Sequence, residues 1–396
     1  MSQRLGPSNM RRFHSFPKIL MTLVGIVSVF LLLSSQINNG VNWKINPNDT
    51  EFASEIFLEL LPYSASLALE QPNGPVIHFL EGYGHTTYSN RMLCAIESAC
   101  VANPNSSVIV HMKSTKLLWT PEIVQLLDAF INLRVVTLDQ EELFKKSPLK
   151  TWYEQRRWQQ SSWPVSHFND AVRWLILYHY GGVYMDTDSI SIRPLTPPSF
   201  AALNFVGLES NQWLGAGVIG LATSHHWLPR LALESIANNF QPQEWGAMGP
   251  KLLTKVVSER CGLVMPYTGS SKCSDLTLLP REAFYNIPWW RYQRFVNPDR
   301  NHILSSKLLG NKSVYVVHIW NHLTQSISVP LNAPPTAIYR GDPETNRIPR
   351  TKEFPRPDSS GKTPSNLAHE EKFYSVLAVI AKNVCPITVD LAKYYL

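Results

Sequence analysis

The sequence predicts an α/β fold in which short buried strands and amphipathic helices alternate around a parallel sheet. Between residues 76 and 138, apolar runs of strand length alternate with segments of helical periodicity. Further along, the dipeptide Gly181-Gly182 separates a helical segment from a short apolar strand, and Asp186 and Asp188 follow that strand. A separate apolar segment near the N-terminus lies outside this pattern, so we expect one folded domain behind a hydrophobic segment.

The composition is that of a globular protein and gives no indication of nucleic-acid binding. Hydrophobic residues make up 44% of the chain and charged residues 17%. The net charge is +6 over 396 residues, and Lys and Arg form no concentrated basic stripe along the sequence. Because nucleic-acid-binding domains carry such a stripe, we predict no nucleic-acid partner.

The N-terminal apolar segment is expected to be a membrane anchor. Residues 19–35 are uncharged and near the short limit for crossing a bilayer, so they suit a thin one. The basic residues before them predict a cytosolic N-terminus and a lumenal remainder: Arg4, Arg11, Arg12 and Lys18. The alternative is a cleaved signal peptide, whose apolar region is usually shorter. We expect a cytosolic tail at 1–18, an anchor at 19–35, a stem at 36–75 and a single lumenal domain at 76–396.

Sequons and cysteines agree with a lumenal domain. Three sequons offer acceptors for N-glycosylation, at Asn48, Asn105 and Asn311. Five cysteines in an oxidising compartment suggest two disulfides and one free thiol. Cys261 and Cys273 bracket a Gly- and Ser-rich loop and are expected to pair. Cys94 and Cys100 share a predicted helix that would place them roughly 9 Å apart, so Cys385 pairs with one of them, and the sequence leaves open which.

The first part of the folded domain shows the alternation most clearly. Apolar runs predict strands at 76–80, 107–112 and 133–138, and helical spacing predicts helices at 90–101 and 121–130. Pro121 suits the first turn of the second helix, where its missing N–H group costs no hydrogen bond. Because the links between these elements are short, we expect a parallel sheet with helices on both faces.

The next helix is expected to begin at Asn169, a good N-cap, with Asp170 in its first turn. Gly181 and Gly182 would end it, because the chain must turn through φ values that side chains resist. Its apolar stripe has spacings of three and four: Ala171, Trp174, Leu175 and Tyr178. A strand at 183–185 then presents two carboxylates at its C-terminal end, where open α/β sheets bind their ligands.

Asp186 and Asp188 are candidate metal ligands. Residues two apart in a strand share a face, so both carboxylates can address one ion. Two oxygen ligands with other positions left open suit Mn²⁺ or Mg²⁺ held jointly with a diphosphate. Because a bare Asp-x-Asp is also common in solvated turns, the surrounding sequence decides between these readings.

The second half of the chain is less regular. We expect strands at 204–207, 214–220 and 313–320, and helices at 225–238, 249–257 and 368–381. The strand at 214–220 is rich in glycine, so another backbone or a ligand can approach it closely. Residues 330–366 are rich in proline and charge and are expected to be a disordered insertion. Trp289 and Trp290 could stack on an acceptor sugar, but we expect them to fill core.

Seven short pieces of the chain match one known family in order: Phe79 to Glu81, Cys94 to Ala99, Asp170 to Asp188, Gly249 to Thr254, Leu279 to Trp289, Val316 to Asn321 and Cys385 to Leu396. On these pieces the chain resembles the α-1,4-glycosyltransferase family, over roughly residues 76–330 and 368–396. The resemblance implies a GT-A fold, in which a Rossmann-like sheet binds a UDP-sugar with a divalent ion on the Asp-x-Asp carboxylates. It also implies a type II Golgi membrane protein.

The resemblance further implies roles for single residues. Asp170 and Arg173 would hold hydroxyls of the donor sugar, although the two also form an ordinary pair on a helix. Tyr184 and Asp186 would lie at the ribose and the metal, and Asp188 would bind the metal directly.

Two further residues have alternative roles. His318 would contact the metal or the diphosphate, although a lone histidine in an apolar strand is often a core residue. Glu81 would touch the nucleotide or merely begin a turn.

The expected function is retaining transfer of galactose or N-acetylgalactosamine from a UDP-sugar to a glycolipid, forming an α-1,4 linkage. Glu209 is the nearest candidate for a nucleophile, but same-face transfer assisted by the departing phosphate fits better. The family usually has Asn-Gly where this chain has Gly215-Ala216, and polar residues at Ala247-Met248, so donor and acceptor stay open. The alternatives are a GDP-mannose-dependent mannosyltransferase or an inactive lumenal partner of another glycosyltransferase.

Overall fold

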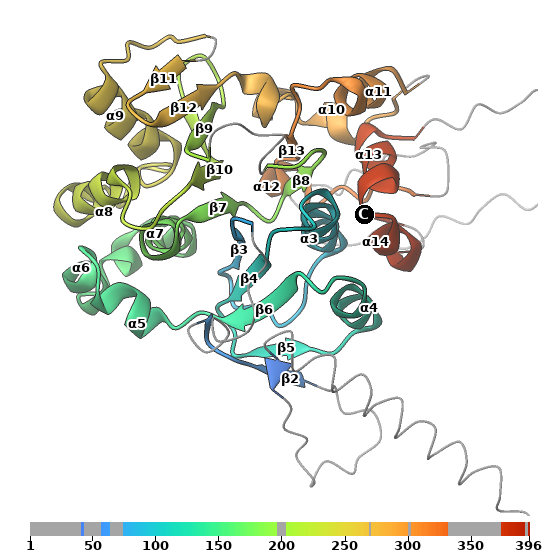
Figure 1. The fold of residues 1–396 in the computed structure, drawn as a ribbon, viewed down its shortest axis with the longest axis horizontal. Helices are drawn as coiled ribbons and strands as arrows, with labels where there is room; N and C mark the ends of the chain where they lie inside the picture. Colours follow the sequence, from blue (N-terminus) through green and yellow to red (C-terminus); the bar gives the residue numbers. More distant parts are fainter. Residues whose placement is uncertain are drawn as a thin grey trace, which may run out of the picture.

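The computed structural model describes residues 41–42, 57–63, 74–195, 203–268, 271–299, 302–331, 374–392 and 395–396 (Figure 1). The predicted tail, the anchor and Asn48 lie outside these ranges, as does the predicted insertion from residue 332 onward. Among the described residues, no helix combines the length and the hydrophobicity needed to span a bilayer.

An eight-stranded sheet forms the centre of the molecule, in the order β11-β12-β9-β10-β7-β3-β4-β6. Its parallel half consists of β7 (Gly182–Met185), β3 (Ile77–Glu81), β4 (Val108–Met112) and β6 (Leu133–Thr137). All four strands are buried along their length, which is why they read as continuous apolar runs. The predicted α/β sheet is confirmed for this half.

The other half of the sheet is mixed, which the sequence did not indicate. It contains β9 (Phe205–Leu208), β10 (Leu214–Leu221), β11 (Ser271–Cys273) and β12 (Leu276–Leu279). Strand β10 runs antiparallel to both β7 and β9, whereas β12 is parallel to β9 and antiparallel to β11. The link between β9 and β10 is too short for the crossover that parallel neighbours require.

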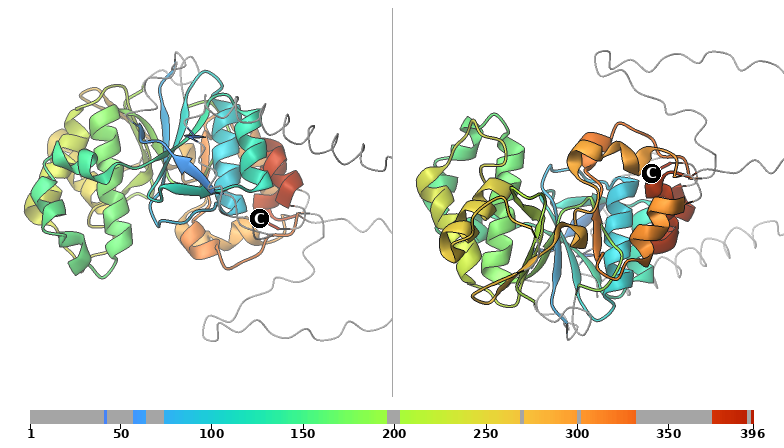
Figure 2. Two further views of the ribbon diagram at one scale, coloured as in Figure 1. Left: turned by 90° about the horizontal axis from the view of Figure 1, so that it is seen from below. Right: turned by 90° about the horizontal axis from the view of Figure 1, so that it is seen from above.

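Helices cover both faces of the sheet, as predicted (Figure 2). One layer contains α3 (Asn90–Ala102) and α4 (Pro121–Ala129), with α13 (Val376–Val384) and α14 (Pro386–Ala392) packed beside them. The opposite layer contains α5 (Gln140–Lys145), α6 (Lys150–Glu154), α7 (Pro164–Tyr180), α8 (Trp227–Asn239) and α9 (Pro250–Cys261). The two layers bury separate apolar clusters against the sheet.

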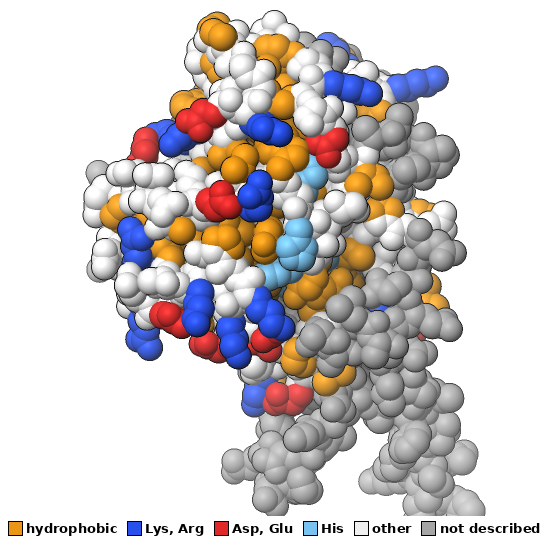
Figure 3. Space-filling model, turned by 60° about the vertical axis from the view of Figure 1, so that its left-hand side comes forward, with side chains coloured by type: hydrophobic (Ala, Val, Ile, Leu, Met, Phe, Trp, Pro, Cys, Tyr) orange, Lys and Arg blue, Asp and Glu red, His pale blue; other side chains and the backbone are white. Residues whose placement is uncertain are grey.

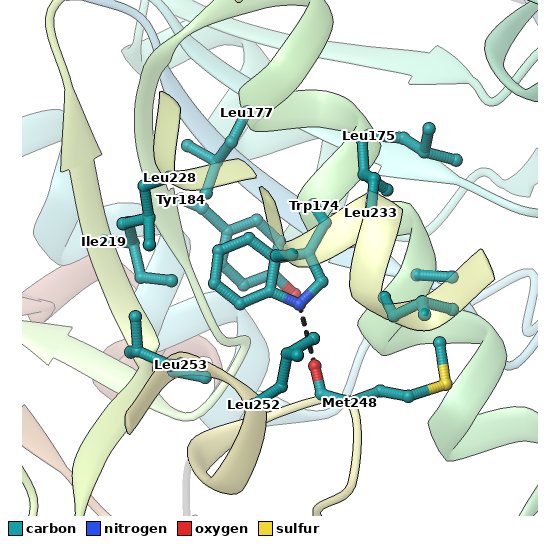
Figure 4. Close-up of a cluster of buried hydrophobic side chains, with 14 of the residues drawn as sticks. Trp174, Leu175, Leu177, Tyr184, Ile219, Leu228, Leu233, Met248, Leu252 and Leu253 are labelled. Carbon is teal, nitrogen blue, oxygen red and sulfur yellow. Dashed lines mark hydrogen bonds between the residues drawn. The ribbon is translucent and has the colours of Figure 1, made fainter. Parts of the chain in front are cut away.

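Trp174 on α7 lies in the apolar cluster between the sheet and the layer that contains α5 to α9 (Figure 4). Its ring is fully buried among leucines of α7, α8 and α9, and its indole N–H donates to the Met248 carbonyl at 2.7 Å. That bond ties the loop before α9 to α7, which carries Asp170 and Arg173. Packing and hydrogen bonding therefore fix the helix that faces the site.

Surface charges on the face with α5, α8 and α9 are mixed in sign (Figure 3). Lys146 pairs with Glu142, and Arg230 pairs with Glu234, each one helical turn apart. All four side chains are exposed, so these pairs contribute little to stability.

Two smaller sheets complete the fold. Strand β8 (Ser189–Ser191) pairs antiparallel with β13 (Val316–His318), and α12 (Asn321–Thr324) follows directly. Strand β2 (Phe57–Leu60) pairs with β1 (Val41–Asn42) and with β5 (Lys116–Leu118), a strand that was not predicted. Leu58 is fully buried, so the folded part of the chain begins within the segment predicted as a stem.

Helix α7 begins six residues earlier than predicted. Asn169 lies inside the helix, and the N-cap position belongs to Trp163, which makes no side-chain cap bond. Pro164 explains the early start, because its fixed φ suits the first position of a helix. The predicted end is confirmed, since Gly181 and Gly182 have φ of +67° and +79°.

The C-terminal segment is joined to α3 by a disulfide and by buried charges. Cys385 bonds to Cys94, which settles the open choice, and Cys100 is a buried free thiol. The second disulfide joins Cys261 and Cys273. The Glu97 carboxylate, fully buried on α3, accepts backbone N–H bonds from Ile387 and Thr388 at 2.8 and 2.7 Å.

Candidate metal and donor-binding site

The backbone around β7 fixes the two carboxylates of the Asp-x-Asp sequence. Asp186 follows β7 directly, and its N–H donates to the Gly217 carbonyl on β10 at 2.8 Å. The side chain of Asp188 accepts the backbone N–H of Asn321 at 2.8 Å, while its carbonyl accepts from Ile319. Two strands and the start of α12 therefore hold the carboxylates before any ligand binds.

His318 lies beside both carboxylates because β8 pairs with β13. Its Nε2 is 3.3 Å from Asp188 Oδ1 and 3.7 Å from Asp186 Oδ2. One ligand atom from each residue lies within 4.8 Å of the others, so the three can surround one cation. Two carboxylates and an imidazole suit Mn²⁺, and the carboxylates also suit Mg²⁺. The structure thus brings together the three residues predicted as metal ligands.

The glycines of β10 make room for this cluster and for the aromatic ring beneath it. A Cβ atom on Gly217 would lie 2.8 Å from Asp186 Oδ2 and 3.0 Å from the His318 ring. One on Gly215 would lie 2.3 Å from the Tyr285 ring, whose hydroxyl accepts the Gly217 N–H. The close approach predicted from the glycine-rich sequence is therefore made by side chains of the protein itself.

Arg173 connects Asp170 with the cluster. Its guanidinium donates to Asp170 Oδ1 at 2.5 Å and to Asp186 Oδ1 at 2.8 Å, and it lies 4.9 Å from the centre of the Tyr184 ring. Only 7% of the residue is exposed. Arg173 therefore does more than pair with Asp170 on the same helix, since it also fixes one of the predicted metal ligands from inside the protein.

The charges of the cluster follow from these contacts. Burial alone would raise the pKa of Asp186, but Arg173 and His318 outweigh it and hold that pKa well below the usual range. Burial would lower the pKa of His318, whereas Asp188 and Asp186 raise it above its ordinary value. For Asp170, burial outweighs the attraction of Arg173 and raises the pKa. Asp186 is therefore ionised, as a metal ligand must be.

Contacts within the protein hold Tyr184 and Glu81. The Tyr184 ring is 3% exposed, lies in the apolar cluster with Trp174 (Figure 4) and has the Arg173 guanidinium 4.9 Å from its centre; its contact with a ribose stays a prediction. The Glu81 carboxylate accepts the N–H of Gly84 at 3.0 Å and contacts His85 Nδ1 at 2.8 Å. The structure thus shows Glu81 fixing a turn, and its contact with the nucleotide stays a prediction.

The turn that Glu81 fixes presents a residue that the sequence reasoning missed. Tyr83 is 62% exposed and stacks on His85 with 5.8 Å between ring centres. The pKa of its hydroxyl is raised, first by burial of that group and then by Asp186, Asp170 and Asp188. The place of Tyr83 directly after the first strand, at the end of the sheet that carries Asp186 and Asp188, was the available signal.

Glu209 follows β9 at the same end of the sheet. Its half-buried carboxylate makes no hydrogen bond or ion pair with any residue in the described ranges. Burial raises its pKa to about 7, and Asp186 raises it while His318 lowers it.

The two departures from the family pattern lie around the site. Gly215 packs against Tyr285, and Ala216 is 3% exposed. The loop with Ala247 and Met248 leads to Gly249, where an added Cβ atom would lie 3.4 Å from Asp170 Oδ1.

The prediction that Trp289 and Trp290 fill core is wrong. They lie on the short 3₁₀ helix η3 (Trp289–Arg291) and are 51% and 49% exposed. The flanking Ile287 and Phe295 occupy the core positions, and the turn between them faces outward.

The possible glycosylation sites in the described ranges lie at the surface. Asn105 is exposed and Asn311 is half-buried.

Two family models match the chain. The alpha 1,4-glycosyltransferase conserved region matches residues 221–340, and the glycosyltransferase sugar-binding region containing DXD motif matches residues 89–213. The lactosylceramide 4-alpha-galactosyltransferase of Mus musculus is 33% identical over 255 residues, covering 63% of this chain and 68% of the relative. The alpha-1,4-N-acetylglucosaminyltransferase of Homo sapiens is 29% identical over 262 residues, covering 63% and 72%.

Solved structures overlap with the chain only in part. PaToxG glycosyltransferase has a TM-score of 0.35 at 17% identity, covering 48% of this chain and 70% of that one. An active-site mutant of LgtC has a TM-score of 0.33 at 14% identity, covering 62% and 87%.

Proposed function

The chain belongs to the α-1,4-glycosyltransferase family, and on that basis we propose that it transfers galactose or N-acetylgalactosamine from a UDP-sugar to a glycolipid. The bond formed is an α-1,4 linkage. The names of its relatives support both the linkage and the acceptor class, since they include a lactosylceramide α-galactosyltransferase.

The observation that carries the proposal is the cluster of Asp186, Asp188 and His318 at the carboxyl end of β7. That end of a sheet is where open α/β folds bind nucleotides. Arg173 keeps Asp186 ionised, and the Asn321 N–H orients Asp188, so the ligand atoms are arranged in advance. A divalent cation bound there would neutralise charge on the departing diphosphate.

The reaction we propose retains the anomeric configuration without a covalent intermediate. The acceptor oxygen forms a bond to the anomeric carbon on the face from which the diphosphate leaves. The bond to the phosphate oxygen breaks, and that oxygen receives both the electron pair and the acceptor proton. A glycosyl adduct on Glu209, detected by mass spectrometry of the intact protein, would replace this mechanism with double displacement.

A donor screen tests the proposal. The chain is incubated with UDP-galactose, UDP-N-acetylgalactosamine, UDP-N-acetylglucosamine and GDP-mannose, with lactosylceramide as acceptor and with Mn²⁺ or a chelator. We expect transfer from one of the first two donors, dependence on the cation, and about a 10³-fold loss of kcat/KM in Asp188→Asn. Transfer from GDP-mannose would make the chain a mannosyltransferase, and no turnover by folded protein would favour an inactive partner.

We also propose that the chain is a single-pass type II protein of the Golgi membrane. The basic residues before the apolar segment at 19–35 support this orientation. Protease treatment of sealed Golgi vesicles should leave the folded domain intact, whereas its digestion there would contradict the orientation.

A further inference from the structure

Exposed tryptophans gather at the end of the sheet that holds the cluster. In the described ranges, five tryptophans are exposed: Trp163, Trp213, Trp245, Trp289 and Trp290. Each lies on a segment that borders this end: the start of α7, the hairpin between β9 and β10, the loop before α9, and η3. Since exposed apolar groups gathered at one place mark an interaction surface, we expect this end of the sheet to contact a partner.

The Trp289–Trp290 pair is connected to the metal cluster by a continuous path. The His318 ring lies 4.4 Å from the Trp320 ring, measured between centres, and the Trp320 indole N–H donates to the Ile287 carbonyl at 2.7 Å. Pro288 then leads directly into η3, where the two indoles meet edge to face at 5.6 Å. The pair therefore lies next to the segment that supports His318, outside the cluster itself.

Positive charge accompanies this pair. Arg291 and Arg294 are exposed on η3 and α10 (Gln293–Val296), and α10 packs against α13 (Figure 1). Neither arginine forms an ion pair with another residue of the described ranges, in contrast to Lys146 and Arg230 on the helical face. Indole rings together with arginines suit the headgroup region of a bilayer, where rings lie between apolar and wet layers and cations meet phosphates.

We propose that residues Trp289 to Arg294 dock on the lipid surface that carries the acceptor. This inference rests on the proposed glycolipid acceptor. A short glycolipid leaves its terminal sugar close to the bilayer, so the metal cluster must approach the membrane for transfer to occur. Tryptophans beside that cluster enter the headgroup layer at low cost, and Arg291 and Arg294 bind lipid phosphates.

Fluorescence quenching tests the contact without any need for catalysis. The full chain is reconstituted in phosphatidylcholine vesicles, with and without phosphatidylserine, that contain brominated lipid as a quencher of indole fluorescence. We expect Trp289→Ala/Trp290→Ala to remove part of the quenching, and Trp245→Ala, an exposed tryptophan beside Glu244, to remove less. Arg291→Ala/Arg294→Ala should reduce the quenching chiefly in vesicles with phosphatidylserine.

Activity on two acceptors separates lipid docking from stacking on a sugar. For lactosylceramide in vesicles, kcat/KM of the double tryptophan variant should fall about tenfold or more, while for a soluble lactoside it should stay within about twofold. Ile131→Ala removes an exposed side chain at the opposite end of the sheet. It should change kcat/KM for neither acceptor.

The outcomes distinguish the two proposals. Equal losses on both acceptors would show that the tryptophans bind sugar and would overturn the docking proposal, as would unchanged quenching in the tryptophan variant. Quenching that is lost when Trp289 and Trp290 are replaced would support docking. If the chain then transferred sugar to neither acceptor, the proposed function would be refuted while docking stood.

Discussion

The two ends of the central sheet shift the pKa values of buried histidines in opposite directions. At the carboxyl end, His318 lies beside Asp186 and Asp188, which raise its pKa. Near the starts of β3 and β7, His78 Nδ1 lies 3.0 Å from His111 Nε2, and both residues are at most 1% exposed. Burial lowers the pKa of His78 to about 3, and burial together with His78 lowers that of His111.

This difference shows that the charges of neighbouring groups, and not the extent of burial alone, decide the direction in which the pKa of a buried group shifts. The histidine pair is surrounded by the rings of Tyr63 and Tyr180 and is neutral. The metal cluster is ionised because Arg173 supplies a matched charge from inside the protein. We therefore expect the two ends to respond differently to changes of charge, of packing and of pH.

Removing the countercharge should have the largest effect. Arg173→Met leaves the half-buried carboxylates of Asp170 and Asp186 without their arginine partner, so the free energy of unfolding should fall by about 3 kcal/mol in urea denaturation. Arg230→Met is the matched control, because its pair with Glu234 is exposed, and it should change stability by less than about 1 kcal/mol. Equal effects of the two substitutions would show that Arg173 does not hold the cluster.

Adding one methyl group should disturb the charged end less strongly. Gly217→Ala places Cβ against Asp186 and His318, so it should destabilise the fold by about 1–3 kcal/mol and weaken Mn²⁺ binding in calorimetry. Gly310→Ala on α11 (Ile303–Gly310) is the control, because no atom lies within 4 Å of the added carbon. Unchanged Mn²⁺ affinity in Gly217→Ala would argue against a cation at this cluster.

Acid should affect the neutral end gradually. Below pH 6.5 the unfolded chain binds protons at His78 and His111 that the folded protein excludes, so stability falls as pH decreases toward the lowered pKa values. Each such histidine contributes a slope of about 1.4 kcal/mol per pH unit between those limits. His111→Gln should therefore flatten the dependence of unfolding free energy on pH between 6.5 and 4.5, and an unchanged slope would contradict the neutral pair.

The sequence predicted features that local chemistry determines. Gly181 and Gly182 end α7 because of their φ angles, and the apolar runs of β3, β4 and β6 reflect burial on both sides. Asp186 and Asp188 follow from their position after β7. For these elements, a few neighbouring residues suffice.

Features that depend on distant contacts were not predictable in this way. The salt bridge from Arg173 to Asp186 and the bond from Asn321 to Asp188 join residues on different elements. The choice of Cys94 over Cys100 depends on which side of α3 meets the C-terminal helices. For the same reason the sequence wrongly predicts a core position for Trp289: the size of an indole indicates burial, whereas its direction depends on the turn after Pro288.

The contacts of α3 with the last residues have a consequence for the order of synthesis. Glu97 obtains its hydrogen bonds from Ile387 and Thr388, and the Arg91 guanidinium reaches the Ile327 and Leu396 carbonyls. The partners of Glu97 follow it by 290 and 291 residues, so this buried carboxylate on the first helix after β3 lacks them until α14 has been synthesised. The contacts of α3 are therefore completed only after α14 has emerged from the ribosome, and a nascent chain would depend on chaperones in the meantime.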